Sequence, residues 1–205
     1  MRTKALLLSA ALLAAGLTGS TAQSVYSVNA VGYVNLSLPA AYSMIANPLN
    51  TTNNTLNALL SDAPNSSQVL KWNGTGFDVA TFFFGAWDNN FTLNPGEGAF
   101  ILPNGPYTVT FVGEVMQGSL TNPIPAGYSI RASQVPQSGG LTTTLGLTQL
   151  ENGSQVLVWN GSGYNVHTLF FGNWDPTEPS INVGQSFFIN AAGAGASWTR
   201  AFSVN

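Results

Sequence analysis

The feature that most constrains this chain is an internal duplication. Four blocks recur in the same order about 87 residues further along the chain: 38–46 as 124–132, 67–77 as 154–164, 83–88 as 170–175 and 95–101 as 183–189. Ordered recurrence of this kind indicates two copies of one structural unit. We therefore expect a first repeat over residues 23–112 and a second over residues 113–205.

A hairpin is the clearest local signal in each repeat. Asn73-Gly74 and Asn160-Gly161 each follow a short apolar run and precede an aromatic one. Asn-Gly suits a two-residue type I′ turn, because both central residues need positive φ. With the turn placed there, Trp72 pairs with Thr75 and Leu70 pairs with Phe77.

Side-chain alternation then assigns the two faces of the hairpin. One face carries large apolar residues, which are Leu70, Trp72, Phe77 and Val79 in the first repeat and Leu157, Trp159, Tyr164 and Val166 in the second. The other face carries Lys71 in one copy and Val158 in the other, so it tolerates polarity. We expect the Leu/Trp face to be the core face.

The remaining pattern predicts an all-β fold. Further strands are expected at 30–36, 42–46, 99–102 and 107–112, with counterparts in the second repeat. Leucine spacing predicts one short helix at 54–61 and a weaker one at 141–150. Many short strands separated by Gly, Pro and Asn favour two tandem β-sandwich-like or barrel-like repeats, each with at most one short helix.

The first 22 residues have the pattern of a secretory signal peptide. Arg2 and Lys4 precede an apolar run, and Ser20 and Ala22 stand at the −3 and −1 positions of a cleavage site before Gln23. The apolar run, about 13 residues long, is shorter than the about 20 that a membrane-spanning helix needs. We therefore expect an exported protein, secreted or at the cell surface, with no membrane span after cleavage.

Charge and cysteine content narrow the function classes. Without residues 1–22 the chain keeps eight acidic residues and only Lys71, Arg131 and Arg200 as basic ones. Such a chain has no basic patch for phosphates, so nucleic acid is not an expected partner. With no Cys in the sequence, a thiol nucleophile and a thiolate metal site are both excluded.

Three segments carry a resemblance to a known group of proteins. They are AYSMIANPL at 41–49, WNGTGF at 72–77 and PGEGAFI at 95–101. The chain resembles small secreted bacterial β-repeat proteins of unknown function, and is similar to β-sandwich modules of bacterial surface and adhesin-like proteins. The resemblance covers nearly all of residues 25–205 and implies fold and location rather than activity. The second repeat departs from it, with Ser133-Gln134 at the place of Asn47-Pro48 and Ser186 at the place of Gly98.

Catalytic and metal-binding readings find little support. The one histidine, His167, has Asp175 nearby in sequence but no Gly-x-Ser-x-Gly motif to complete a triad. Asp88 with Glu97, and Asp175 with Glu178, flank equivalent loops and could serve as paired carboxylates. Oxygen ligands for calcium are offered by Asp88-Asn89-Asn90 and by Asp175 with Glu178, without an EF-hand pattern. Glu97 becomes Gln185 in the second copy, so neither pair is kept in both. We expect no enzyme and no cofactor.

Two binding functions remain open. The favoured one is a non-enzymatic structural or adhesion module that self-assembles through edge strands. The residues expected at those edges are Val25, Tyr26 and Val28 near the mature start, and Phe202 and Val204 near the end. The alternative is binding of an extracellular glycan by loop residues, Trp87 with Asp88 and Trp174 with Asp175. Each tryptophan could instead close one end of its own repeat.

Overall fold

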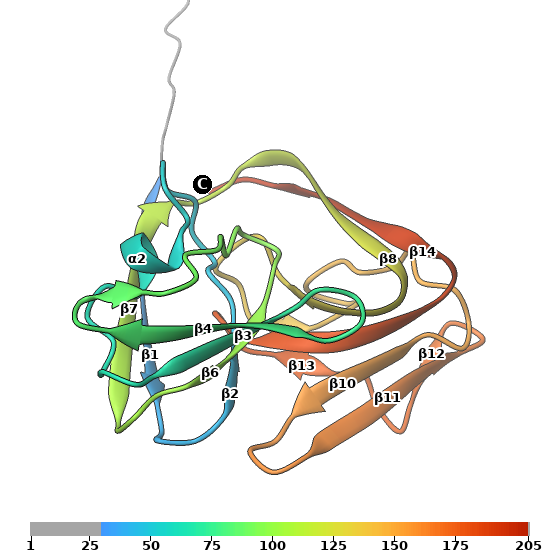
Figure 1. Ribbon diagram of the computed structural model, residues 1–205. Helices are drawn as coiled ribbons and strands as arrows, with labels where there is room; N and C mark the ends of the chain where they lie inside the picture. Colours follow the sequence, from blue (N-terminus) through green and yellow to red (C-terminus); the bar gives the residue numbers. More distant parts are fainter. Residues whose placement is uncertain (1–29, 205) are drawn as a thin grey trace, which may run out of the picture.

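The computed structural model describes residues 30–204, and in this part of the chain it is almost entirely β (Figure 1). The first repeat comprises β1 (Val31–Leu38), β2 (Ser43–Ile45), α2 (Leu56–Leu59), β3 (Gln68–Trp72), β4 (Phe77–Phe83), β5 (Ala86–Trp87), β6 (Ala99–Leu102) and β7 (Tyr107–Glu114). The second comprises β8 (Gly118–Ala132), β9 (Gly139–Gly140), β10 (Gln155–Trp159), β11 (Tyr164–Phe170), β12 (Asn173–Asp175), β13 (Ser180–Ile181) and β14 (Ser186–Phe202). The predicted all-β class is confirmed.

The two repeats contain matching sheets. The first has the strand order β2-β6-β3-β4-β5, and the second has β8-β14-β10-β11-β12, which is the same order with corresponding strands. Neighbouring strands pair antiparallel throughout both sheets. One repeat therefore lies on each side of the molecule, as the blue-to-green and yellow-to-red halves of the ribbon show (Figure 1).

The repeats differ in how their outer strands continue. In the first, Pro39 separates β1 from β2, and the loop from Pro103 to Pro106 separates β6 from β7. β1 and β7 then pair as a separate ribbon. In the second repeat the corresponding strands are not interrupted: β8 and β14 form one long antiparallel pair, with a register shift between Ala191 and Gly195. A proline has no N–H for the ladder, so it interrupts pairing unless a bulge accommodates it.

The hairpin register differs from the prediction. Trp72 pairs with Phe77 and Leu70 with Val79, so the loop has four residues, Asn73 to Gly76. The Asn73 side chain explains the longer loop, because its Oδ1 accepts hydrogen bonds from the N–H groups of Thr75 and Gly76. This local bonding competes with the two-residue turn that Asn-Gly also permits. Asn160 and Gly161 occupy the same loop in the second repeat, where Asn160 Oδ1 accepts from Ser162 and Gly163. Since the register is shifted by an even step, the same residues still share a face.

The Leu/Trp face, predicted as the core face, does not line the interior of either repeat. Within the first repeat, the interior is formed by the opposite face, with Val69, Ala80 and Phe82 buried against the leucines of the 49–60 segment. In the second repeat Val156 and Phe187 pack in the same way against Leu141, Leu145 and Leu147. The hairpin is apolar on both faces, so alternation alone could not choose the inner one.

Helix formation is less extensive than predicted. Of 54–61, only α2 (Leu56–Leu59) is helical; in 141–150, residues 141–145 form turns and 146–150 are irregular. These segments nevertheless close the two cores in the same way. The indole N–H of Trp87 donates to the carbonyl of Leu60, and that of Trp198 donates to the carbonyl of Leu145.

A third apolar cluster, which we name the junction core, joins the repeats. It contains four matched pairs: Met44 and Ile130, Leu70 and Leu157, Trp72 and Trp159, and Phe100 and Phe188. The bonds around it are also matched. Trp72 Nε1 donates to the carbonyl of Tyr128, and Trp159 Nε1 donates to that of Tyr42. The Leu/Trp face therefore packs against its own copy, which gives the molecule an internal pseudo-twofold.

Candidate functional site

Two shallow troughs flank the junction core. One of about 220 Å³ is lined by residues that include Tyr42, Phe77 and Trp159. The other, of about 240 Å³, is lined by residues that include Trp72, Tyr128 and Phe188. Their aromatic rings meet mostly edge to face, as between Trp72 and Phe188 at 5.6 Å between centroids. This geometry is favourable for aromatic rings and holds the walls of both troughs in place.

An uncovered apolar surface continues outward from the junction core along β4 and β11. We name it the outer strips: Phe77, Val79 and Phe83 on β4, and Tyr164, Val166 and Phe170 on β11. Strand alternation places each set on the same side as Leu70 or Leu157. Their exposed fractions match closely between the repeats, for instance 45% for Val79 and 44% for Val166. The surface is therefore a property of the duplicated unit.

A phenylalanine stands at the tip beyond each strip. Phe84 is 97% exposed and Phe171 is 90% exposed. Both have positive φ, 51° and 47°, and each precedes a glycine that also has positive φ. These pairs are thus two-residue hairpin turns for which Asn-Gly is the preferred sequence. A left-handed conformation costs a residue with a large side chain about 1–2 kcal/mol.

The sequence held a signal for these tips that alternation and motif analysis did not use. Phe-Phe-Gly spans the strand end and the turn in both copies, while the flanking positions have diverged from Ala86 to Asn173 and from Phe82 to Leu169. A glycine after a run of phenylalanines indicates a tight turn. An aromatic residue in such a turn has no interior to enter, because the turn extends beyond the sheet.

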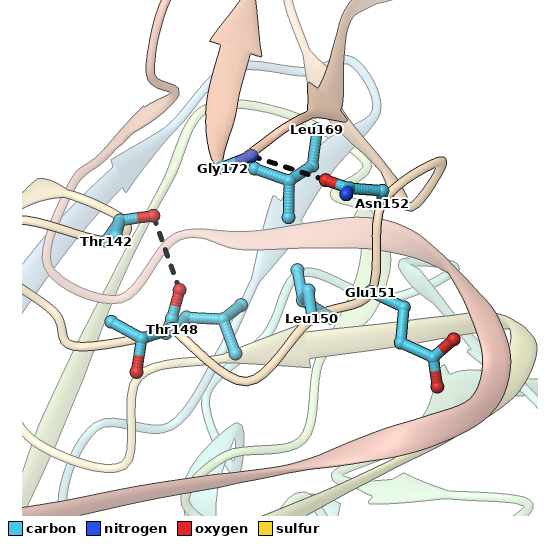
Figure 2. Close-up of a pocket in the computed structure, with 8 residues that line it drawn as sticks. Thr142, Thr148, Leu150, Glu151, Asn152, Leu169 and Gly172 are labelled. Atoms are coloured by element: carbon cyan, nitrogen blue, oxygen red, sulfur yellow. Dashed lines mark hydrogen bonds between the residues drawn. The ribbon is translucent and has the colours of Figure 1, made fainter.

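The second repeat contains a larger and more polar hollow, of about 660 Å³ (Figure 2). Its lining residues are Thr142, Leu147, Thr148, Leu150, Glu151, Asn152, Leu169 and Gly172. Figure 2 shows Leu150 and Leu169 pointing toward one another, while the Glu151 carboxylate extends away from them. Two hydrogen bonds tie the wall together, from Thr142 Oγ1 to the carbonyl of Leu147 and from Gly172 N–H to Asn152 Oδ1.

A substitution between the copies contributes to this hollow. Phe82, 4% exposed, fills the corresponding space in the first repeat, where α2 also packs. The second repeat has Leu169 at that position and turns in place of the helix. Loss of one aromatic ring and of the helix leaves the space open.

The two predicted glycan-stacking tryptophans differ in exposure. Trp87 is 3% exposed and belongs to the core of the first repeat, so neither face of its indole is open to a sugar. Trp174 is half-buried, and its Nε1 donates to Thr142 Oγ1 on the wall of the hollow. Asp88 Oδ1 accepts from the N–H of Thr81 across the β4–β5 pair. Asp175 pairs with Thr168 at the corresponding place.

The carboxylates and the histidine weighed for chemistry have structural contacts. Glu97 forms an ion pair of 3.0 Å with Lys71. Glu178 accepts from the N–H groups of Thr142 and Thr143. Although partial burial raises it, these bonds hold the pKa of Glu178 below its ordinary value. His167 Nδ1 lies 2.7 Å from the carbonyl oxygen of Thr177. Within residues 30–204, His, Asp and Glu form no group of three that could hold a metal ion.

The structure describes only the C-terminal one of the two predicted assembly edges. Val25, Tyr26 and Val28 lie outside the described residues. Phe202 pairs with Gly118 of its own chain, and the N–H of Val204 donates to the side chain of Gln117. One edge of the C-terminal strand is thus occupied within the molecule, and assembly through these edges stays a prediction.

Comparison with protein-family models, with curated proteins and with solved structures finds no significant match to this chain. In the part of the chain that the structure describes, no helix is long and apolar enough to cross a membrane. The chain's own surfaces are therefore the basis on which a function can be proposed.

Proposed function

We propose that this chain is an exported, non-catalytic structural module of the extracellular space or cell surface, and that it acts by adhesion. The observation that carries the proposal is the pair of outer strips with their phenylalanine tips. Soluble monomers rarely leave contiguous apolar patches of more than a few hundred Å² exposed unless the patch is a contact surface. Here the same uncharged surface is present in both repeats.

The polar chemistry of the molecule supports the same reading. Three of the four carboxylates considered for catalytic pairs are bonded to Lys71 or to main-chain N–H groups, namely Glu97, Asp88 and Glu178. The hollow of the second repeat has hydroxyl and amide groups on its wall. A secreted hydrolase remains the competing class. Turnover of a glycoside or ester substrate that Asp88→Asn abolishes would establish it.

Adhesion can be tested on surfaces of defined chemistry. Residues 23–205 are passed over methyl-terminated and hydroxyl-terminated gold in a quartz-crystal microbalance. We expect strong retention on the methyl surface and at least about ten-fold less after Phe84→Asn and Phe171→Asn, since removal of the exposed rings removes most of the apolar contact area. Tyr33→Ser, which removes an exposed ring on β1, is the matched control. Equal retention of all three proteins would remove the outer strips from the function.

Export is tested separately with the full chain in a bacterial host. The expected outcome is a processed protein that begins at Gln23 and is accessible to protease added outside the cell. Retention of the unprocessed chain inside the cell would contradict the proposed location without bearing on the apolar surface.

A second candidate function is supported by the hollow of the second repeat. Its volume of about 660 Å³ lies within the about 300–1,000 Å³ typical of ligand sites. Thr142, Thr148 and Asn152 supply hydroxyl and amide groups, and Leu150 and Leu169 supply apolar wall. Such a mixture suits a saccharide, which has both hydroxyl groups and apolar ring faces.

The saccharide candidate predicts a specific asymmetry between the copies. Leu169→Phe restores the residue that closes the first repeat, so we expect it to abolish retention on a glycan array. Phe82→Leu, the reverse change in the first repeat, is the matched control and leaves retention unchanged. A chain that retains no glycan before mutation, or retains it equally after Leu169→Phe, rules this candidate out.

A further inference from the structure

We propose that the outer strips are the contact surface for a second copy of this chain, so that two chains associate face to face. This inference rests on the proposed adhesive function and names its partner. It also assigns self-association to a sheet face, whereas the sequence pattern had suggested strand edges.

Continuity with the junction core identifies the partner. Each sheet presents one face outward from its own core. Where β3 and β6 form that face, the other repeat covers it, as Trp72 and Phe188 show. Where β4 or β11 forms it, the same face is uncovered. The molecule thus already shows what packs on this surface, namely another copy of the same repeat, and a second chain supplies two such copies.

The two strips meet at the junction. Phe77 and Tyr164, the first residues of the strips, line the same trough. From there each strip follows its own strand outward to its tip. A second chain related by a twofold axis can set its β11 strip on the β4 strip of the first, and the reverse, so that both contacts form at once.

The exposed area is of the size that a stable pair requires. At about 200 Å² for a fully exposed aromatic side chain, the outer strips and their tips together expose roughly 800 Å². A standard protein–protein interface buries about 800 Å² on each partner. Either strip alone would supply only half of this, whereas both strips on one partner suffice.

Along the outer strips themselves the outward positions are uncharged. Between Phe77 and Phe83 the outward positions are Val79 and Thr81, and the matching positions in the second repeat are Val166 and Thr168. A strand facing water would ordinarily carry charged or strongly polar residues there. The nearest carboxylates, Asp88 and Asp175, lie opposite Thr81 and Thr168 on the neighbouring strands, so like charge is confined to the margin of each strip.

The tips and the troughs are matched in number and chemistry. Each chain offers two exposed rings, Phe84 and Phe171, and two apolar troughs of about 220 and 240 Å³. A cavity of about 150 Å³ is enough to hold a benzene ring in other proteins. A phenylalanine in a turn that favours asparagine destabilises the isolated chain, but it gains a buried environment if a partner's trough receives it.

The test compares residues 23–205 with Phe84→Asn/Phe171→Asn by sedimentation velocity over a concentration series. We expect the parent protein to pass from monomer to dimer, and the variant to have a dissociation constant at least about ten-fold higher. Asn-Gly is the preferred sequence for this turn, so the variant should unfold at the same or a higher temperature. Weaker association without loss of fold is the diagnostic result.

A second variant and a label check the location of the contact. Tyr33→Ser removes an exposed ring outside the outer strips and should leave the dissociation constant unchanged. Because the chain has no cysteine, Thr81→Cys accepts a single spin label between Val79 and Phe83. The label is expected to become immobilised as protein concentration rises, while one at exposed Thr52→Cys stays mobile.

Three results would overturn the inference. They are a parent chain that stays monomeric throughout the series, a tip variant that associates as well as the parent, and a Thr81 label that stays mobile in the dimer. Binding of the monomer to phosphatidylcholine vesicles would identify a lipid surface as the partner in place of a second copy. The adhesive function would still hold in each case if the parent protein is retained on the methyl-terminated surface and the Phe84→Asn/Phe171→Asn variant is not.

Discussion

Gly98 and Ser186 occupy equivalent positions in the two repeats and lie against one another across the junction. A Cβ added to Gly98 would meet Cβ of Ser186 and, at 2.6 Å, Cγ2 of Ile130. Near the pseudo-twofold axis equivalent positions meet each other, and there is room for only one side chain. The departure of the second copy from the first at this position is thus a packing requirement of the junction.

Exchange of the two residues tests this relationship. We expect Gly98→Ser to lower the free energy of unfolding by about 1–3 kcal/mol through overpacking. Ser186→Gly should cost less than about 1 kcal/mol, because the buried Ser186 hydroxyl has no hydrogen-bond partner among the described residues. The double exchange should recover most of the loss, as measured by urea unfolding. A double variant as unstable as Gly98→Ser would contradict the account.

The junction tryptophans should govern how the two repeats unfold together. Trp72→Ala removes packing against Phe188 and the hydrogen bond to the Tyr128 carbonyl. The expected loss is about 2–4 kcal/mol, below that of a fully buried tryptophan because Trp72 is only half-buried. Trp72→Phe keeps an aromatic ring and should lose only about 1 kcal/mol. Circular dichroism during urea unfolding measures both, and equal losses would mean that the ring does not pack as described.

Stability should fall in alkaline solution through Tyr107. Burial, followed by the 2.7 Å hydrogen bond to Asp62 and the charge of that carboxylate, raises the pKa of Tyr107 far above its ordinary value. The folded state therefore holds this proton when the unfolded state releases it. The contribution to stability is full below about pH 10, the ordinary pKa of tyrosine, and declines as pH rises above it.

Tyr107→Phe isolates that contribution. The variant should lose about 1–2 kcal/mol at neutral pH, and its stability should fall less steeply above pH 10 than that of the parent. Tyr33→Phe, at an exposed position on β1, should reproduce the parent profile. Identical alkaline slopes in parent and Tyr107→Phe would assign the loss to other groups.

The Glu178 carboxylate should anchor the 141–150 segment beside the hollow. It accepts from Thr142 N–H at 2.5 Å and from Thr143 Oγ1 at 2.9 Å. Since these bonds lower its pKa in the folded state, their contribution is present at neutral pH and lost as pH falls through the folded value. Glu178→Gln should speed amide exchange at Thr142 and Thr143 at pH 7, with Glu151→Gln as control. Unchanged exchange at these amides would count against the anchor.

Much of the fold was accessible from the sequence because it depends on local pattern. The duplication, the all-β class and the strand at Ala99–Leu102 follow from recurrence, alternation and turn residues. The set of residues that share a face also followed, even though Trp72 pairs with Phe77 and not with Thr75. A shift of two residues moves the register and preserves the face.

Tertiary structure alone decided which face lies inside. Val69 and Leu70 are both apolar, so either face of β3 could have entered the core; the leucines of 49–60 cover the Val69 face, and the second repeat covers the other. Whether a candidate functional residue is exposed was decided in the same way, by the segments that cover it. Trp87 is closed off by α2, and Phe84 lies beyond every covering element. Phe82 is buried in the core of the first repeat, whereas its counterpart Leu169 lines the hollow of the second. The sequence by itself determined the repeated unit and its strands, because these depend on neighbouring residues. The tertiary structure decided burial and exposure, because those depend on what a distant segment covers.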